Sequence, residues 1–422
     1  MTTPGAPPVG AATSAAPTDP GRAPLVLAPF RGLRYDPTVA GDLGTVVSPP
    51  YDVLDADTVR DLEAGNRRNI VRLILTRRFE RPYVAVRERL QSWREQGCLV
   101  ADPEPSLYLY QYSVDGVTVR GVIGLVGLRE EQEGVILPHE GVMPGPVEDR
   151  SILMRTTGSN LEPILLVHQG TDRHRALLAD VTSAPPVADF TAGDDSHHVL
   201  WRVHDPGVLA ELAAELAAGT ALIADGHHRY AAYLALQHEL RDPDAPRGAS
   251  PWDHGLAMLV DQDDLPLTVG PIHRSVAALT MSDVLELAVA AGDKVRTCTD
   301  RESALTCLGG PPSPDRSHFV VSDGRAWVVL TTERTHPVDA GVLHDRLLLT
   351  WNVSEEQVGY HHSLDQALHT ITRQPGVVVA VRPPTMEQVM AEAARGTRMP
   401  RKSTSFSPKP RMGLVMRDLR DT

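Results

Sequence analysis

Apolar and polar positions along the chain repeat with two periods, one typical of strands and one typical of helices. Apolar runs rich in β-branched residues at 107–114 and 117–128 flank Asp115-Gly116, and similar runs flank Asp323-Gly324. A two-residue Asp-Gly connection between such runs indicates a β-hairpin with antiparallel strands. Helical spacing of apolar residues predicts helices over residues 58–64, 83–96, 208–218, 230–240, 282–291, 342–350 and 385–394.

Further apolar runs predict strands that are interspersed with these helices. We therefore expect an α+β fold with mixed sheets, hairpins and flanking helices. Residues 1–23, rich in Pro, Ala and Gly, are expected to form a disordered tail. Residues 24–422 are expected to form one globular region of two packed subdomains, with loops at 170–197 and 241–252. The predicted strands cover residues 45–47, 164–167, 199–203, 220–224 and 377–381, together with a strand pair at 256–260 and 267–269.

The charge balance and the scarcity of lysine exclude several classes of protein. Lys and Arg number 41 and Asp and Glu number 54, which gives a net charge of −13. So acidic a chain is a poor candidate for non-specific binding to nucleic acid or to an anionic membrane, since both require a positive surface. The three lysines are Lys294, Lys402 and Lys409. None of them stands in a P-loop or in the strand motif of protein kinases.

Cysteine spacing and hydropathy indicate a protein of a reducing compartment. Cys98, Cys298 and Cys307 show neither metal-binding spacing nor a disulfide framework. No apolar run approaches the ~20 residues that a membrane span requires. We therefore expect a cytoplasmic location, with no membrane and no nucleic acid as partner.

The sharpest chemical signal is the Asp-Gly-His-His-Arg segment at 225–229. A strand pattern runs into this segment and a helical pattern runs out of it. The first N–H groups of a helix lack intrahelical acceptors, and together with the helix dipole they favour a bound anion. The segment therefore predicts a phosphate site to which the two histidines and the arginine add side-chain donors. In the alternative interpretation, there is no phosphate site: Asp225 only caps the N-terminus of the helix, and the histidines pack against other residues or lie exposed.

A second polar cluster joins His139-Glu140 to Glu148-Asp149-Arg150 through a Pro/Gly-rich stretch. Two carboxylates in one cluster suit a general base and a metal ligand. An ordinary polar loop explains the same residues equally well, if one of them caps the N-terminus of a helix that begins near residue 151.

Two further segments are candidates for the same site. Tyr51-Asp52 follows two prolines, which hold a loop in place, although an ordinary turn explains it better when it is taken alone. Residues 395–411 carry six cations and no acid. We expect this basic run to fold back over the cleft, anchored by Phe406 and Leu414, rather than to form a solvated tail. The pair His361-His362 is interpreted as structural.

Five motifs follow one another along the chain: Pro49-Pro50-Tyr51-Asp52-Val53, His139-Glu140 with Asp149-Arg150, Asn160-Leu161-Glu162-Pro163-Ile164, Ala224-Asp225-Gly226-His227-His228-Arg229-Tyr230 and Met399-Pro400-Arg401-Lys402-Ser403-Thr404. In this order they resemble the domain of unknown function 1015 family, and the resemblance runs from about residue 28 to residue 414. The chain departs from the family pattern at Val142, where a hydroxyl residue is common, and at Ala231, where Glu is common. A Lys that commonly precedes the Asp149-Arg150 pair is also missing. If these positions touch substrate, this protein uses a different one or has lost activity.

The segment at 225–229 also resembles the phosphate-binding turn of the ParB/sulfiredoxin superfamily, which includes free-serine kinases, chromosome-partitioning nucleotide hydrolases and sulfiredoxin. This resemblance implies a nucleotide-dependent kinase that phosphorylates the hydroxyl of a small metabolite, serine or a related hydroxy amino acid. It also implies Mg²⁺ with ATP or ADP as phosphate donor. One alternative is a nucleotide-binding regulatory or partition-like protein without metabolite kinase activity, and another is a scaffold that keeps only the fold.

The resemblance also implies roles for individual residues. Glu140 is expected to act as the base, with Asp52 as its competitor, while Asp225 and Asp149 hold the metal ion and Asp225 shares in catalysis. The expected substrate contacts are Tyr51, His139 and Arg150. The expected phosphate or nucleotide contacts are Gly226, His227, His228, Arg229, Lys402, Ser403 and Thr404.

Overall fold

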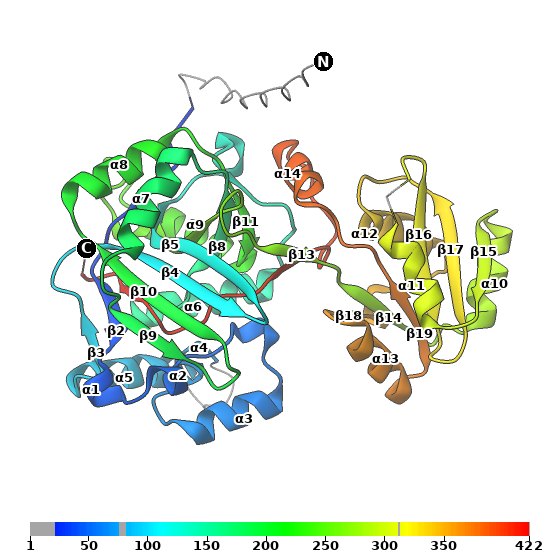
Figure 1. The fold of residues 1–422 in the computed structure, drawn as a ribbon, viewed down its shortest axis with the longest axis horizontal. Coiled ribbons are helices and arrows are strands. Elements are labelled where there is room, and N and C mark those ends of the chain that lie inside the picture. Colours follow the sequence, from blue (N-terminus) through cyan, green and yellow to red (C-terminus); the bar gives the residue numbers. More distant parts are fainter. Residues whose placement is uncertain (1–21, 76–81, 311–312, 422) are drawn as a thin grey trace, which may run out of the picture.

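Two lobes, each built around its own β-sheet, make up the part of the chain that the computed structural model describes, namely residues 22–75, 82–310 and 313–421 (Figure 1). Residues 1–21 of the expected tail lie outside the described residues. The chain leaves the larger lobe through β13 (Thr268–Gly270) and returns to it through α14 (Met386–Ala394) and β20 (Ser405–Ser407). The mixed sheets with flanking helices confirm the predicted α+β class.

The sheet of the larger lobe has nine strands and contains both parallel and antiparallel pairs. Pairing is parallel between β12 and β8 and between β11 and β6, and antiparallel elsewhere in this sheet. The predicted hairpin around Asp115-Gly116 is confirmed as β4–β5. The strand order is β6 (Ile136–Leu137), β11 (Ala221–Asp225), β8 (Ile164–His168), β12 (His254–Asp261), β5 (Val117–Gly127), β4 (Leu107–Val114), β10 (His197–Val203) and β9 (Ala188–Thr191), with β1 (Leu27–Ala28) beside β5.

Both faces of this sheet are covered, because alternate residues of each strand point to opposite sides. Leu107 and Leu109 pack in a core with α7 (Asp172–Thr182), α8 (Pro206–Ala217) and α9 (His227–Leu240). Tyr108 and Tyr110 face the other way, into a core that α14 and the C-terminal segment complete. The C-terminal segment is therefore a structural layer of the larger lobe.

The larger lobe also contains a smaller four-stranded sheet and several helices, most of which form its lower part in Figure 1. The strands are β3 (Leu99–Ala101), β2 (Gly32–Tyr35), β21 (Met416–Asp418) and β7 (Ser159–Asn160), in that order. The helices are α1 (Pro37–Ala40), α2 (Leu43–Val46), α3 (Ala56–Gly65), α4 (Val71–Ile74), α5 (Pro82–Glu95) and α6 (Pro144–Thr157), of which α6 packs against both α5 and α9.

The smaller lobe has a six-stranded antiparallel sheet with its own hydrophobic cores. Its strands are β15 (Lys294–Cys298), β17 (Trp327–Glu333), β16 (Arg316–Ser322), β19 (Gly376–Ala380), β14 (His273–Ala277) and β18 (Val358–His361), in that order. Its helices are α10 (Met281–Ala290), α11 (Arg301–Gly309), α12 (Asp339–Val342), which continues as a π-helix (Leu343–Leu348), and α13 (Leu364–Arg373). Among the described residues, no helix of either lobe is both long and apolar enough to cross a membrane.

Three sequence predictions about local structure are wrong. The β-branched run at 45–47 does not form a strand, because Asp42 caps the Gly44 N–H and starts α2. Residues 170–197 are not a loop, since Thr171 caps α7 and β9 follows it. The strands near 256–260 and 267–269 do not pair with each other, because β12 lies between β5 and β8 and β13 pairs with β20.

Candidate functional site

The predicted strand–turn–helix at 225–229 is confirmed. Strand β11 ends at Asp225, Gly226 turns the chain with φ 95°, and α9 begins at His227. Gly226 has no side chain to cap the helix, so the first N–H groups of α9 open onto the neighbouring cavity, whose wall includes His227 and His228. The start of α9 therefore has the uncapped backbone N–H groups that the sequence prediction of an anion site requires.

Gly226 is required at this turn for two reasons. A φ of 95° is unfavourable for residues with a Cβ, and a Cβ here would lie 2.9 Å from Ile164 and 3.0 Å from Arg229. We expect Gly226→Ala to lower the free energy of unfolding by about 1–3 kcal/mol, as measured by urea denaturation. Gly141→Ala, on the nearby loop where a Cβ meets nothing within 4 Å, is the control. Equal effects of the two substitutions would contradict this account of the turn.

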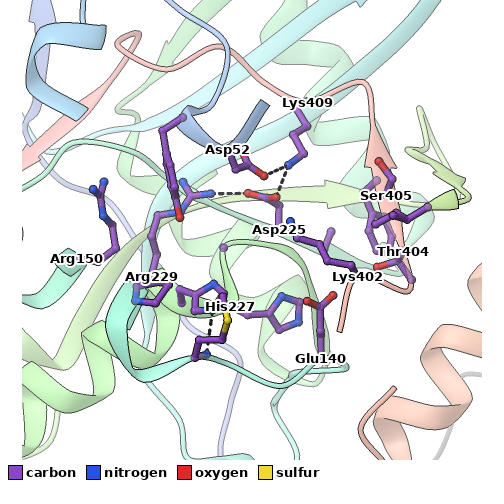
Figure 2. A pocket seen from close by; sticks show the side chains of 18 of the residues that line it. Asp52, Glu140, Arg150, Asp225, His227, Arg229, Lys402, Thr404, Ser405 and Lys409 are labelled. Carbon is purple, nitrogen blue, oxygen red and sulfur yellow. Dashed lines mark hydrogen bonds and ion pairs between the residues drawn. The ribbon is translucent and has the colours of Figure 1, made fainter. Parts of the chain in front are cut away.

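A chain of alternating charges crosses the cavity above this turn (Figure 2). Lys409 Nζ donates to Asp52 Oδ2 at 2.5 Å and to Asp225 Oδ1 at 2.6 Å, while Arg229 Nη2 donates to Asp225 Oδ2 at 2.5 Å. Burial alone would raise the pKa of Asp225, but Lys409 and Arg229 hold it below its usual range. Burial likewise would lower the pKa of Lys409, and the two carboxylates raise it instead. Asp225, Lys409 and Arg229 are therefore charged.

Arg229 and Arg150 are held by partners inside the protein. Arg229 is 2% exposed and also donates to the carbonyl of Pro163 at 2.5 Å. Arg150, 4% exposed, pairs with Asp149 at 2.5 Å and lies 3.5 Å from Glu162. These arginines reach the cavity wall, but their guanidinium groups are already engaged.

Tyr51 and Asp149 complete this network at the edge of the cavity. The Arg150 guanidinium stacks 4.7 Å from the centre of the Tyr51 ring, and the Tyr83 hydroxyl donates to Asp149 at 2.8 Å. Asp149 and Arg150 lie within α6, which begins at Pro144. A cap for a helix starting near residue 151 is therefore not their role.

The basic C-terminal run folds back over the cavity, as predicted. The Met399 N–H donates to the His139 carbonyl at 2.9 Å, which brings the run beside Glu140. The Lys402 N–H donates to Glu140, and Lys402 adopts a φ of 58°, a left-handed conformation that residues with side chains rarely take. The Thr404 hydroxyl hydrogen-bonds His139 Nε2 at 2.8 Å.

Burial decides which groups of this region carry charge. It raises the pKa of Glu140, and the nearby Asp225 charge adds to the shift, while Lys402 partly opposes it. Burial lowers the pKa of His139 to about 4 and that of His227 well below its ordinary value. The pKa of His228 is also lowered, by burial and by Lys402, and its Nε2 accepts the Met143 N–H at 3.1 Å. The histidines are therefore neutral near pH 7.

A cavity of about 440 Å³ gathers most of the predicted site residues (Figure 2). His139 and Ser403 are absent from its wall: His139 is fully buried, and Ser403 donates its hydroxyl to the Pro400 carbonyl. The predicted residues that line the cavity are Tyr51, Asp52, Glu140, Asp149, Arg150, Asp225, Gly226, His227, His228, Arg229, Lys402 and Thr404.

Two titratable residues of the cavity wall, Lys409 and His362, are not among the predicted site residues. Lys409 stands among six cations in the sequence, and only the rarity of lysine in this chain distinguishes it. His362 comes from the smaller lobe and hydrogen-bonds Ser405 at 2.9 Å, so it is not purely structural. Its neighbour His361 bonds Ser275 within the smaller lobe.

The expected metal ion does not fit the carboxylates in this arrangement. Both oxygens of Asp225 already accept hydrogen bonds from cations. Asp149 pairs with Arg150 and accepts from Tyr83. Within residues 22–75, 82–310 and 313–421, no group of three or more His, Cys, Asp or Glu side chains is placed to hold a metal ion.

Comparisons with known proteins give a family and distant structural likenesses. The family model described as protein of unknown function (DUF1015) matches residues 27–359. No curated protein matches the sequence. Among solved structures, a free serine kinase in complex with AMP is 15% identical, covering 70% of this chain and 91% of its own, with a TM-score of 0.37.

Two other solved structures show similar values. A conserved hypothetical protein from Pyrococcus furiosus is 16% identical over 71% of this chain and 96% of its own, with a TM-score of 0.36. SbnI with a C-terminal truncation from Staphylococcus aureus is 11% identical over 69% of this chain and 86% of its own, with a TM-score of 0.37. At these TM-scores the likenesses carry no argument about activity.

Proposed function

This chain belongs to the DUF1015 family, and we propose that it is a nucleotide-dependent kinase for the hydroxyl group of a small metabolite. One observation carries the proposal. The uncapped N-terminus of α9, the cations Lys402 and Lys409, and the half-buried carboxylate of Glu140 all line one cavity. Phosphoryl transfer requires this combination of an anion site, positive charge and a base that can accept a hydroxyl proton.

The phosphates of the nucleotide are proposed to lie against the turn at Gly226. The N–H groups of His227 and His228 are oriented by α9 and need no rearrangement to bind an anion. Lys402 is exposed at the cavity wall and supplies a mobile positive charge. Arg229 acts behind the turn, because its guanidinium is engaged by Asp225 and Pro163.

Glu140 is a better base than Asp52 in this cavity. The raised pKa of Glu140 gives its carboxylate a greater affinity for a proton, whereas the Asp52 carboxylate already accepts a hydrogen bond from Lys409. In the proposed step, the substrate hydroxyl oxygen attacks the terminal phosphorus of the nucleotide. The bond from that phosphorus to the bridging oxygen breaks, and the hydroxyl proton moves to Glu140.

A hydroxy amino acid such as serine is the proposed acceptor, by the local resemblance of residues 225–229 to free-serine kinases. The cavity volume of about 440 Å³ lies in the range of small-molecule sites. Purified protein should be incubated with ATP or ADP and a panel of hydroxy amino acids, and nucleotide consumption followed. Consumption that requires one acceptor supports the kinase. Nucleotide binding without transfer to any acceptor would favour a regulatory protein instead.

Replacing Lys402 is expected to weaken nucleotide binding. Lys402→Ala removes a charge-assisted hydrogen bond to phosphate, so we expect affinity to fall by about 1–3 kcal/mol in calorimetric titration. Lys294→Ala is the matched control, because Lys294 is exposed on β15 in the smaller lobe. If both variants bind nucleotide as tightly as the wild type, Lys402 does not contact the phosphates.

A further inference from the structure

The position of Lys409 between two carboxylates is the position that a divalent cation takes in many phosphate sites. Its Nζ lies 2.5 Å from Asp52 Oδ2 and 2.6 Å from Asp225 Oδ1 (Figure 2). Asp52 belongs to a turn that follows Pro50, and Asp225 ends strand β11. One ammonium group thus joins two parts of the larger lobe that are distant in sequence.

The backbone on both sides of Lys409 is fixed by the larger lobe. Before it, β20 pairs with β13, and the Tyr112 hydroxyl donates to the Pro408 carbonyl at 2.7 Å. After it, the Arg411 N–H donates to the Tyr110 hydroxyl at 3.3 Å, and the Arg411 side chain pairs with Asp194. The Lys409 side chain is only 12% exposed. Its placement is therefore a built feature of the fold.

The charges around Lys409 balance without a metal ion. Asp52 and Asp225 carry two negative charges, and Lys409 and Arg229 carry two positive charges in direct contact with them. A divalent cation at the same carboxylates would meet the Lys409 ammonium at close range and would be repelled. It would have to displace a side chain whose backbone is held on both sides.

Lysine suits this position better than arginine. An ammonium group has three N–H donors directed to three sides, whereas the guanidinium fork is planar and matches one flat acceptor. Only three of the 41 basic residues are lysines, and one of them stands here. Asp52 and Asp225 accept hydrogen bonds from two of its donors, and no other described residue accepts one from the third.

We propose that Lys409 is the resident cation of this cavity: it occupies the place of a divalent metal ion between Asp52 and Asp225, and its third N–H donates to a phosphate oxygen of the ligand. The phosphate contact rests on the proposed function. The exclusion of a metal ion from the two carboxylates does not rest on it, because it follows from the position of Lys409 between them.

The exclusion is tested with Mn²⁺ alone, followed by electron paramagnetic resonance and without nucleotide. Lys409→Met removes the charge and keeps the length of the side chain, so this variant is expected to bind one Mn²⁺ ion at least about tenfold more tightly than the wild type. The double variant Asp52→Asn/Lys409→Met should lose that site. Lys402→Met is the matched control, because it removes a charge from the same cavity without freeing a carboxylate pair, and it should bind Mn²⁺ like the wild type.

Two results would overturn the exclusion. One is a wild-type protein that already binds one Mn²⁺ ion and loses it on the single substitution Asp52→Asn, which alters a carboxylate that is 24% exposed. This measurement needs no Lys409 variant and therefore stands even if Lys409→Met fails to fold. The other is a folded Lys409→Met protein that binds Mn²⁺ no more tightly than Lys402→Met.

The phosphate contact is tested separately, by titrating ADP in the presence of EDTA. The wild type is expected to bind ADP in EDTA with the affinity that it shows in Mg²⁺, whereas Lys409→Met should bind measurably only when Mg²⁺ is present. Wild-type binding that is abolished by EDTA would overturn the phosphate contact. Absence of ADP binding under every condition would contradict both the proposed function and this phosphate contact. The Mn²⁺ measurement would still test the exclusion of a metal ion independently.

Discussion

Replacing Glu140 with Gln is expected to lower the rate of phosphoryl transfer by about 10²–10⁴-fold, the usual contribution of a general base. The amide has nearly the shape of the carboxylate but cannot accept the hydroxyl proton. Nucleotide affinity should change little, because Glu140 is proposed to accept the hydroxyl proton and not to contact the phosphates. The measurement is the turnover rate with saturating nucleotide and acceptor, together with the nucleotide dissociation constant.

The dependence of this rate on pH gives a second check on Glu140. A base works in its charged form, so the wild-type rate should rise as pH rises through the pKa of Glu140. Burial raises that pKa, so the rise should lie above the range of an ordinary carboxylate. Asp52→Asn is the matched control and should keep this rise. If Asp52→Asn removes activity and Glu140→Gln does not, Asp52 is the base.

Replacing Arg229 with Met is expected to lower the free energy of unfolding by about 3–5 kcal/mol, because it removes a buried cation from the charge network that includes Asp225 and Glu162. Arg229 is 2% exposed and pairs with Asp225, and the nearby Glu162 is 4% exposed. The Glu162 charge is one of the causes that raise the pKa of Arg229 despite its burial. Urea denaturation monitored by circular dichroism measures the change.

A surface arginine provides the comparison for this substitution. Arg173 pairs with Glu211, and both side chains are about half exposed. Arg173→Met should change the free energy of unfolding by no more than about 1 kcal/mol, as is usual for exposed ion pairs. If Arg229→Met changes the free energy of unfolding as little as Arg173→Met does, Arg229 does not organise the site and is free to contact ligand.

The turn at 225–229 shows how much of the site can be predicted from the sequence. An apolar run, a glycine and a helical pattern are local signals, so the strand, the turn and the start of α9 follow directly from them. The convergence of Asp52, Glu140 and Lys402 on the same cavity also follows, because stiff or charged segments without another role suggest a shared site.

The pairing of charges could not be predicted in the same way. Lys409 lies 184 positions from Asp225 and 357 from Asp52. No local pattern records such contacts, because they depend on how the C-terminal segment packs against the sheet. For the same reason, the sequence does not show that Arg229 and Arg150 are engaged inside the protein rather than free for ligand.

Tertiary context also overrides local preference in the fold. The β-branched residues at 45–47 favour a strand, yet the Asp42 cap and the burial of Val46 and Val47 produce a short helix and its end. The contribution of the smaller lobe to the cavity could not be predicted either, because no local pattern indicates that His362 lines the cavity and hydrogen-bonds Ser405.

A crystal structure of the protein with bound ADP tests the central claim most directly. The account predicts that the phosphate groups lie at the N-terminus of α9, within hydrogen-bonding distance of the His227 and His228 N–H groups, with Lys402 or Lys409 in contact. Nucleotide bound with its phosphates elsewhere, and the turn at Gly226 left to solvent, would contradict it.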